Sequence, residues 1–236
     1  AGGNIRYAAD GDIALGLLNA GAGDVSVVSS AGSIVEATAG NNVAADYLRL
    51  EAAGSIGAAG AGNALDTAVA TLSSKSGLGT YILEADGLTL DDTGSGAITV
   101  TRINLDSTTA PVTDGALARS GESAGVYKIE TTGGSIVVAA ASVADAVRAA
   151  GDILIRAGGA GSDLTQNAGA AIESTGGDIS LLAQNAISQN AAVTTSGGTI
   201  DVEAFDGALT MAAGTVTTSA GGNIRYAADG DIALGL

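Results

Sequence analysis

The chain has 236 residues, of which 46% are hydrophobic and only 3% aromatic, so its core must be built from Ala, Val, Ile and Leu. With 25 Asp and Glu against 9 Lys and Arg, the net charge of −16 argues against a nucleic-acid partner, because an acidic surface repels phosphates. The absence of Cys and His excludes disulfides, thiolate metal sites and a histidine base, and no apolar run is long enough to predict a membrane span.

The first segment of the chain is also its last. Residues 1–17, AGGNIRYAADGDIALGL, recur without a change as residues 220–236, an offset of 219 residues from Ile5 to Ile224. Agreement at every position indicates copies of one ancestral segment rather than convergence. The sequence therefore predicts that residues 1–219 are one tandem repeat period of a continuous fold and that residues 220–236 begin the next copy.

A shorter and more degenerate period lies inside the long one. Its marker is one or two glycines, then a polar residue, and then two apolar residues separated by one residue of any type. The lead apolar residues lie 20 to 26 residues apart, as from Ile5 to Val25 and from Ile153 to Ile179. Two further short apolar pieces follow each marker, so one unit predicts three short strands separated by turns. The marker is found in GGNIRY (2–7), GDVSV (23–27), GGSIVV (133–138), GDILI (151–155), GGDISL (176–181) and GGTIDV (197–202).

A three-strand unit of this size can bury its apolar side chains only by stacking on the units before and after it. We therefore expect an all-β solenoid, a right-handed parallel β-helix with three short strands per coil of about 20–26 residues. At about 4.8 Å between coils, about nine coils give a rod roughly 43 Å long for each repeat.

A string of immunoglobulin-like sandwiches is the alternative architecture. That fold predicts aromatic core anchors and hairpins with Asn-Gly or Asp-Gly turns. Trp and Asn-Gly are absent from the chain, whereas Asp-Gly is present, as at Asp86-Gly87 and Asp206-Gly207. The turn evidence is thus divided, and the regular glycine-led period favours the β-helix.

The period is least regular in residues 61–124. Residues 80–90 and 97–105 are predicted to be strands, joined by a turn at residues 91–96. Residues 107–123, which contain Pro111, are predicted to form a longer loop. Residues 141–150 have helical propensity, but we expect a turn of the solenoid there because a third strand is due.

Three phrases carry a family resemblance: ALDTAVATLSS (64–74), YILEADGLTL (81–90) and the long stretch at 176–211. Together with the glycine-led strands, they resemble the repeat region of filamentous-haemagglutinin-like giant exoproteins of Gram-negative bacteria. The resemblance implies a long β-helical stalk that holds an adhesive or toxic tip away from the cell, at the cell surface or outside it. The family's secretion domain and toxin tips have no counterpart in this chain.

Several acidic turns are candidate cation sites. Residues 158–166, GGAGSDLTQ, partly match a calcium-binding nonapeptide, but Thr165 takes the apolar position and no second nonapeptide follows. Asp10-Gly11-Asp12, which recurs at residues 229–231, and Asp91-Asp92 place carboxylates close together. Each is better explained as a polar turn, so we predict no metal and no cofactor; calcium is the ion that such turns would hold.

No arrangement predicts catalysis, and we expect neither catalytic nor cofactor-binding residues. Asp201 and Glu203 share one face of a strand, as the acids of β-helical polysaccharide-cleaving enzymes would. With no His and no Trp, they are predicted to be solvated surface. In GGNIRY, Arg6 is expected to face outward and Tyr7 inward. The amides of Asn185, Gln189 and Asn190 are expected near coil corners, where stacked amides can form ladders.

The sequence thus predicts a structural repeat module of a giant bacterial surface or secreted adhesin, which forms a stiff stalk for cell attachment. Its expected partners are neighbouring tandem copies of the same repeat, and an isolated chain is expected to associate end to end. The alternative is a multivalent binding module that recognises glycans or a receptor on a partner cell through the repeat surface.

Overall fold

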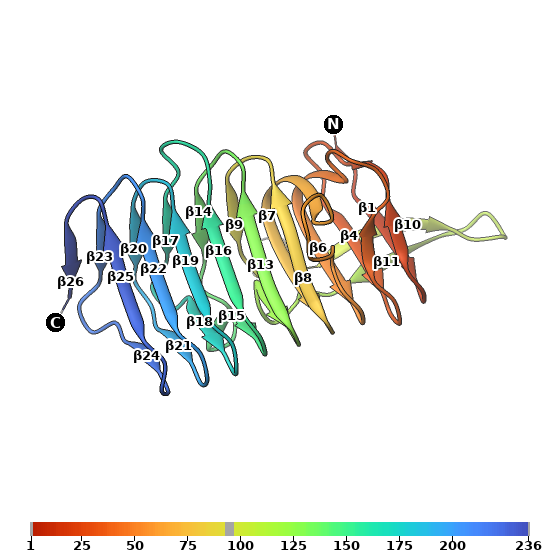
Figure 1. Cartoon of the computed structure of the whole chain (residues 1–236). Helices are drawn as coiled ribbons and strands as arrows, with labels where there is room; N and C mark the ends of the chain where they lie inside the picture. Colours follow the sequence, from red (N-terminus) through yellow and green to blue (C-terminus); the bar gives the residue numbers. More distant parts are fainter. Residues whose placement is uncertain (1, 93–96, 236) are drawn as a thin grey trace.

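A computed structural model describes residues 2–92 and 97–235 of the chain. Its regular elements are strands, β1 to β26, and no described residue is helical. Apart from one hairpin, neighbouring strands pair in parallel and stack along a single axis, with the two termini at opposite ends of the stack (Figure 1). The prediction of an all-β parallel β-helix is confirmed, and separate sandwich domains are not found among these residues.

Three faces run the length of the stack, and each coil contributes one strand or bridge to each face. The first face consists of β1 (Ile5–Ala9), β4 (Val25–Ser29), the second half of β6 (Val43–Ala52), the second half of β7 (Leu65–Ser76), β12 (Gly121–Ser123), β15 (Asp145–Ala149), β18 (Ala171–Ser174), β21 (Val193–Thr195) and β24 (Thr217–Ser219).

The second face consists of β2 (Ile13–Leu15), β5 (Ile34–Glu36), a bridge at Ile56, β8 (Gly79–Glu84), β13 (Val126–Thr131), β16 (Ile153–Ala157), β19 (Ile179–Ala183), β22 (Ile200–Ala204) and β25 (Ile224–Ala228). The third face consists of β3 (Leu18–Asn19), the first halves of β6 and β7, β9 (Leu88–Leu90), β14 (Ile136–Val138), β17 (Leu164–Gln166), β20 (Ile187–Gln189), β23 (Leu209–Met211) and β26 (Ile232–Leu234).

Aliphatic side chains fill the interior in columns, because the register places like residues opposite one another. Ile153, Ile179 and Ile200 pair along the second face and are buried. Tyr127 is the largest fully buried side chain, and its hydroxyl lies 3.3 Å from the Ser74 hydroxyl. The ring of Tyr127 lies against Gly121, where no side chain competes for the space. The core is thus the aliphatic one that the composition predicts, with a tyrosine added where a glycine makes room.

The glycine pairs before β19, β22 and β25 lie at one corner of the coil, where the backbones of successive coils approach closely. A Cβ added at the second glycine of a pair, as at Gly177 or Gly198, would overlap the backbone of the preceding coil. The residue two positions before the pair ties this corner to that coil. Thr195 Oγ1 donates to the Gly177 carbonyl at 2.6 Å and accepts from the Gly198 N–H at 3.2 Å. The sequence marker therefore records a close approach between coils. It is not confined to one corner, since GGNIRY (2–7) precedes β1 of the first face and GGSIVV (133–138) precedes β14 of the third.

The polar residue after the glycines extends this link to the next coil. Asp152 Oδ1 accepts the Asp178 N–H at 2.9 Å, and Asp178 Oδ1 accepts the Thr199 N–H at 2.6 Å. The hydrogen bond from the Thr199 N–H, with a second from its hydroxyl, lowers the pKa of Asp178. An Asp or Asn at this position therefore joins coils, and its role is structural.

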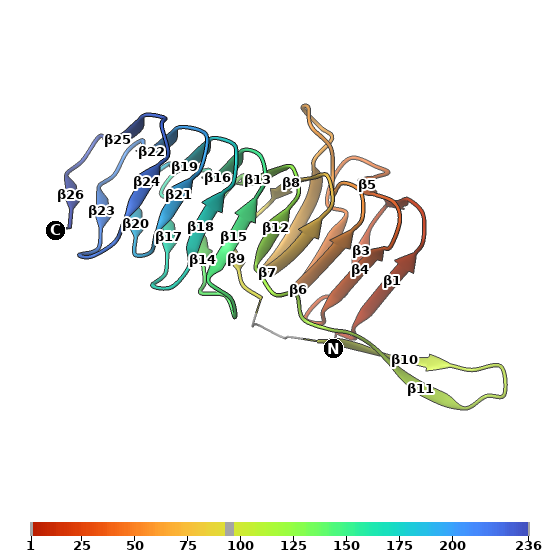
Figure 2. The same ribbon diagram turned by 90° about the horizontal axis from the view of Figure 1, so that it is seen from below.

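One insertion departs from the solenoid. The strand predicted at residues 97–105 is present as β10 (Ile98–Ile103), but it pairs antiparallel with β11 (Thr109–Asp114) to form a hairpin. The loop predicted for residues 107–123 is therefore wrong, since that range contains β11 and also β12 of the next coil. Pro111 is tolerated in β11 because a two-stranded ribbon leaves one edge of each strand unpaired. The hairpin extends past the coils of the N-terminal end (Figures 1 and 2).

Two other predictions for irregular segments are resolved. The strand expected at residues 80–90 is divided between β8 and β9, which lie on different faces. Residues 141–150 contain strand β15 and no helix, as expected for a solenoid. The turn predicted at residues 91–96 falls in part outside the described residues, which omit 93–96.

Candidate functional site

The two identical segments form the same strands but pair on opposite edges. β1 pairs with β4, which follows it along the axis, and Ile5 lies opposite Val25. β25 pairs with β22, which precedes it, and Ile224 lies opposite Ile200. In the described parts of the chain, no strand pairs with the outer edge of β1 or of β25. Each copy therefore shows the pairing that the other one lacks.

Core side chains are exposed at both ends of the stack. Tyr7 is 52% exposed, whereas its counterpart Tyr226 is partly buried and packs against the core. The Tyr226 hydroxyl lies 2.6 Å from Thr217 Oγ1 and donates to Gln189 Oε1 at 2.7 Å. Tyr226 thus occupies the inward position expected for this tyrosine. At the C-terminal end the exposed side chains are Ile224, Ile232 and Leu234.

The arginine of the repeated segment holds different acids in the two copies. Arg6 Nε donates to both carboxylate oxygens of Asp114 at 2.9 Å. Arg225 Nη1 donates to Asp201 and to Glu203 at 2.8 Å, and its Nη2 donates to Glu203 at 3.2 Å. Asp201 and Glu203 lie on the outward surface, as expected, and the next coil supplies them with a cation. The two copies use different nitrogens of the guanidinium group.

These contacts change the acidity of the groups involved. Burial raises the pKa of Asp114, but the hydrogen bonds from Arg6 and Ser26 and the charges of Arg6 and Arg49 together outweigh burial, so the net pKa is lowered. Hydrogen bonds from Arg225 lower the pKa of Glu203. The hydrogen bond to Glu203, and next the one to Asp201, raise the pKa of Arg225. Asp114, Glu203 and Arg225 are therefore charged at neutral pH.

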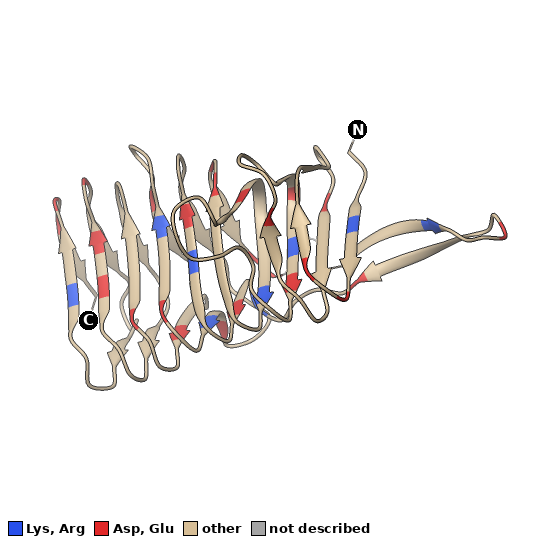
Figure 3. Ribbon diagram, turned by 45° about the vertical axis from the view of Figure 1, so that its right-hand side comes forward, with Lys and Arg blue, Asp and Glu red and all other residues tan. Residues whose placement is uncertain are grey.

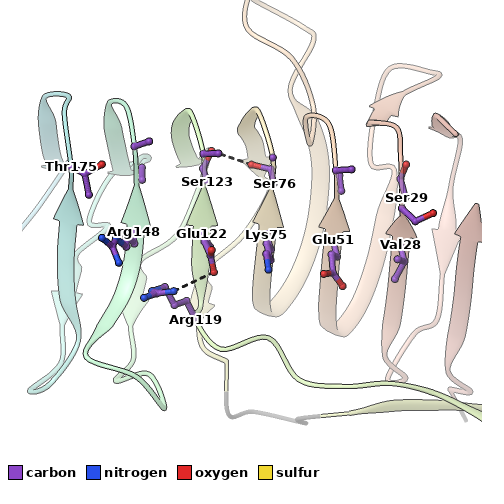
Figure 4. Close-up of a pocket in the computed structure, with 17 residues that line it drawn as sticks. Val28, Ser29, Glu51, Lys75, Ser76, Arg119, Glu122, Ser123, Arg148 and Thr175 are labelled. Atoms are coloured by element: carbon purple, nitrogen blue, oxygen red, sulfur yellow. Dashed lines mark hydrogen bonds and ion pairs between the residues drawn. The ribbon is translucent and has the colours of Figure 1, made fainter. Parts of the chain in front are cut away.

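A groove of about 610 Å³ lies along the first face, over β4, β6, β7, β12 and β15 (Figure 4). Four outward side chains lie opposite one another in register and alternate in sign: Glu51, Lys75, Glu122 and Arg148. Arg119 Nη1 adds an ion pair to Glu122 at 3.3 Å. No aromatic residue lines the groove. The charges largely compensate one another, so the groove suits a polar ligand better than an apolar one.

The turn at residues 158–166 uses its acid within the protein. Asp163 Oδ1 accepts the side-chain N–H of Asn185 at 2.7 Å and the Ala186 N–H at 3.0 Å, and so ties one coil to the next. Gln189 Nε2 donates to Thr217 Oγ1 at 2.8 Å. These amides bond to a carboxylate and a hydroxyl, so the expected amide ladder is not formed by them.

The other acidic turns are used in the same way. Asp10 accepts the Ser30 hydroxyl at 2.7 Å, and Asp12 accepts the Ser33 N–H at 2.8 Å. Asp92 is buried and accepts from Ser142. Within residues 2–92 and 97–235, no group of three or more His, Cys, Asp or Glu side chains is placed to hold a metal ion.

Comparison with known proteins gives no relative: no family model, no curated protein and no solved structure matches the chain. Over the same described ranges, the structure has no helix long and apolar enough to cross a membrane. Function must therefore be inferred from the geometry of the coil ends and of the faces.

Proposed function

We propose that this chain is a structural repeat module of a giant bacterial surface or secreted adhesin, in which tandem copies form one stiff rod. The observation that supports it most is the pairing of the identical segments on opposite edges. At the junction, β25 of one copy would also be β1 of the next, so this strand would lie between β22 of the first copy and β4 of the second. Ile224, which is also Ile5 of the next copy, would then lie between Ile200 and Val25 in one column. The coil stack would then continue across the junction without an interruption.

Continuation also accounts for the exposed core side chains. Tyr7 of a following copy would take the place of Tyr226, bonded to Thr217 and Gln189. Ile232, the counterpart of Ile13, would lie between Leu209 of its own copy and Ile34 of the following copy. Stacking of repeats on their neighbours is what stabilises a solenoid, since no repeat can bury its own ends.

The strand count supports a particular way for copies to follow one another. Nine strands stack on the first face from β1 to β24, which closes residues 1–219, and β25, the counterpart of β1, lies on the second face. One repeat therefore comprises eight full coils and one further strand. At about 4.8 Å per coil it advances about 40 Å, slightly less than nine full coils would give. Each copy is then turned by one face, about a third of a turn, relative to the copy before it.

Charge and the family resemblance support the remaining parts of the proposal. Acidic positions outnumber basic ones along the coils (Figure 3), and the net charge of −16 opposes lateral aggregation of rods. The resemblance to filamentous-haemagglutinin-like exoproteins favours a place outside the cell or on its surface. Neighbouring copies are the principal partners, and open ends lead us to expect end-to-end association of the isolated chain.

Electron microscopy of chains with two, four and eight joined copies tests the proposal. We expect thin rods of uniform width whose length grows by about 40 Å per added copy. Rows of beads, or a growth per copy far above this value, would show separate domains and would contradict a continuous stalk.

The groove on the first face favours a second candidate, a multivalent binding module for glycans or a cell-surface receptor. Its alternating charges offer donors and acceptors to a polar ligand along five neighbouring coils. If this function holds, labelled arrays should bind partner cells saturably, with an affinity that rises steeply with copy number. The double variant E122Q/R148Q should then reduce this binding without altering rod length. Equal binding by the parent and the variant would remove the groove from consideration.

A further inference from the structure

The β10–β11 hairpin lies along the axis of the rod rather than across it. Its base is fixed to three successive coils: the Arg49 Nε donates to the Gly115 carbonyl at 2.7 Å, the Ser26 hydroxyl to Asp114 at 2.7 Å, and Arg6 to Asp114 at 2.9 Å. Asn4 also donates to the Thr99 carbonyl at 3.1 Å. From these anchors the ribbon extends beyond β1, into the space past the N-terminal coil (Figure 2).

The part beyond β1 presents an inward face that continues the anchored one. Ile98, which is buried, and Asp114 lie opposite each other, and the next residues on the same side are the pair Val100 and Val112. Arg102 and Ala110 follow on that side. The projecting face therefore has an apolar pair and then a cation.

The repeated segment identifies what this face would meet in a tandem array. The hairpin is anchored over β1, whose counterpart β25 continues the second face through β22 and β19. The outward residues of those strands are Asp201 and Glu203 on β22, and Ser180 and Leu182 on β19. At about 3.3 Å per hairpin residue against about 4.8 Å per coil, Val112 would lie over β22 and Ala110 over β19.

We propose that the hairpin of each copy crosses the junction and lies on the outward face of β22 and β19 of the preceding copy. This inference depends on the proposed tandem rod and adds to it a clasp between copies. The arginine of the repeated segment supports the clasp from both sides. As Arg6 it binds Asp114 through Nε, and as Arg225 it binds Asp201 and Glu203 through Nη1 and Nη2. In this register Arg102 and Ala110 lie over Ser180 and Leu182 of β19, one coil from the same acids, which the long side chain of Arg102 can reach.

A cross-link in a two-copy chain, residues 1–219 followed by 1–236, tests the clasp. The parent has no cysteine, so an A110C substitution in the second copy and an L182C substitution in the first copy introduce the only thiols. We expect a disulfide to form between them at least about tenfold faster than in a control pair, because contact raises the effective concentration of the two thiols. The control joins A110C to E173C, which lies in the same coil as Leu182 but on the first face.

The outcomes separate the clasp from the rod. A single-copy chain with A110C and L182C should give no intramolecular disulfide, since the two positions lie far apart along one copy. A two-copy chain that is a continuous rod by electron microscopy, yet cross-links no faster than the control, overturns the clasp and leaves the rod standing. A two-copy chain that is not continuous overturns both. Faster reaction with E173C would place the hairpin on the first face and also contradict the proposal.

Discussion

Replacing Tyr127 with alanine is expected to lower the free energy of unfolding by roughly 3–5 kcal/mol, the range found for removing a large buried ring. Tyr127 is fully buried, with 0% of its surface accessible to solvent. Its ring fills the space left by Gly121. Neighbouring coils are tied by parallel ladders on both sides, so they cannot collapse into the cavity. Urea unfolding followed by circular dichroism gives the difference in free energy.

Tyr127→Phe is the matched control for this prediction. It removes only the hydroxyl, whose contact with Ser74 is long at 3.3 Å, so we expect a loss of at most about 1 kcal/mol. Burial raises the pKa of the Tyr127 hydroxyl, so the phenol is neutral at any ordinary pH and the control removes no charge. Equal losses for the alanine and phenylalanine variants would contradict the core position of the ring.

Replacing Gly198 with alanine is the second change with a large expected effect. Its Cβ would overlap the backbone of Gly177 in the preceding coil, and backbone atoms held in a ladder cannot turn aside as a side chain can. We expect a loss of about 1–3 kcal/mol, as for overpacking in other cores. Thermal and urea unfolding of the full chain measure it.

Gly11→Ala serves as the control, because a Cβ there meets nothing within 4 Å. Its stability should stay within about 0.5 kcal/mol of the parent, as for other surface substitutions. If Gly198→Ala were as stable as Gly11→Ala, the glycine pairs could not be explained by the close approach of successive coils.

The regular part of the fold could be predicted from the sequence because its physical causes return once per coil. The glycine pair, the polar residue after it and the alternating apolar residues each correspond to a contact with the neighbouring coil, as at Gly198 and Thr199. The hairpin could not be predicted in this way. Strand β11 is rich in Thr, Ala and Pro, and no Asn-Gly turn connects it to β10.

For a related reason, the sequence could not show where within a coil the repeat ends. Strands β6 and β7 each turn a corner without a glycine marker, and one coil contributes only a bridge at Ile56 to the second face. Marker spacing alone therefore does not show that a repeat ends one strand into a coil. Nor could the sequence show that Arg225 binds Asp201, since these residues are neighbours only once their coils are placed in register.

The most direct test of the account is the position of the hairpins along an array of at least six copies. The fully exposed Leu105 at the hairpin tip can be replaced with cysteine and labelled with gold, because the parent has no other thiol. A continuous rod with a third of a turn per copy predicts labels on three sides, which return to the same side after three copies, about 120 Å along the axis. Labels on one side every 40 Å or so would contradict the fractional coil, and labels without a fixed spacing would contradict the continuous β-helix itself.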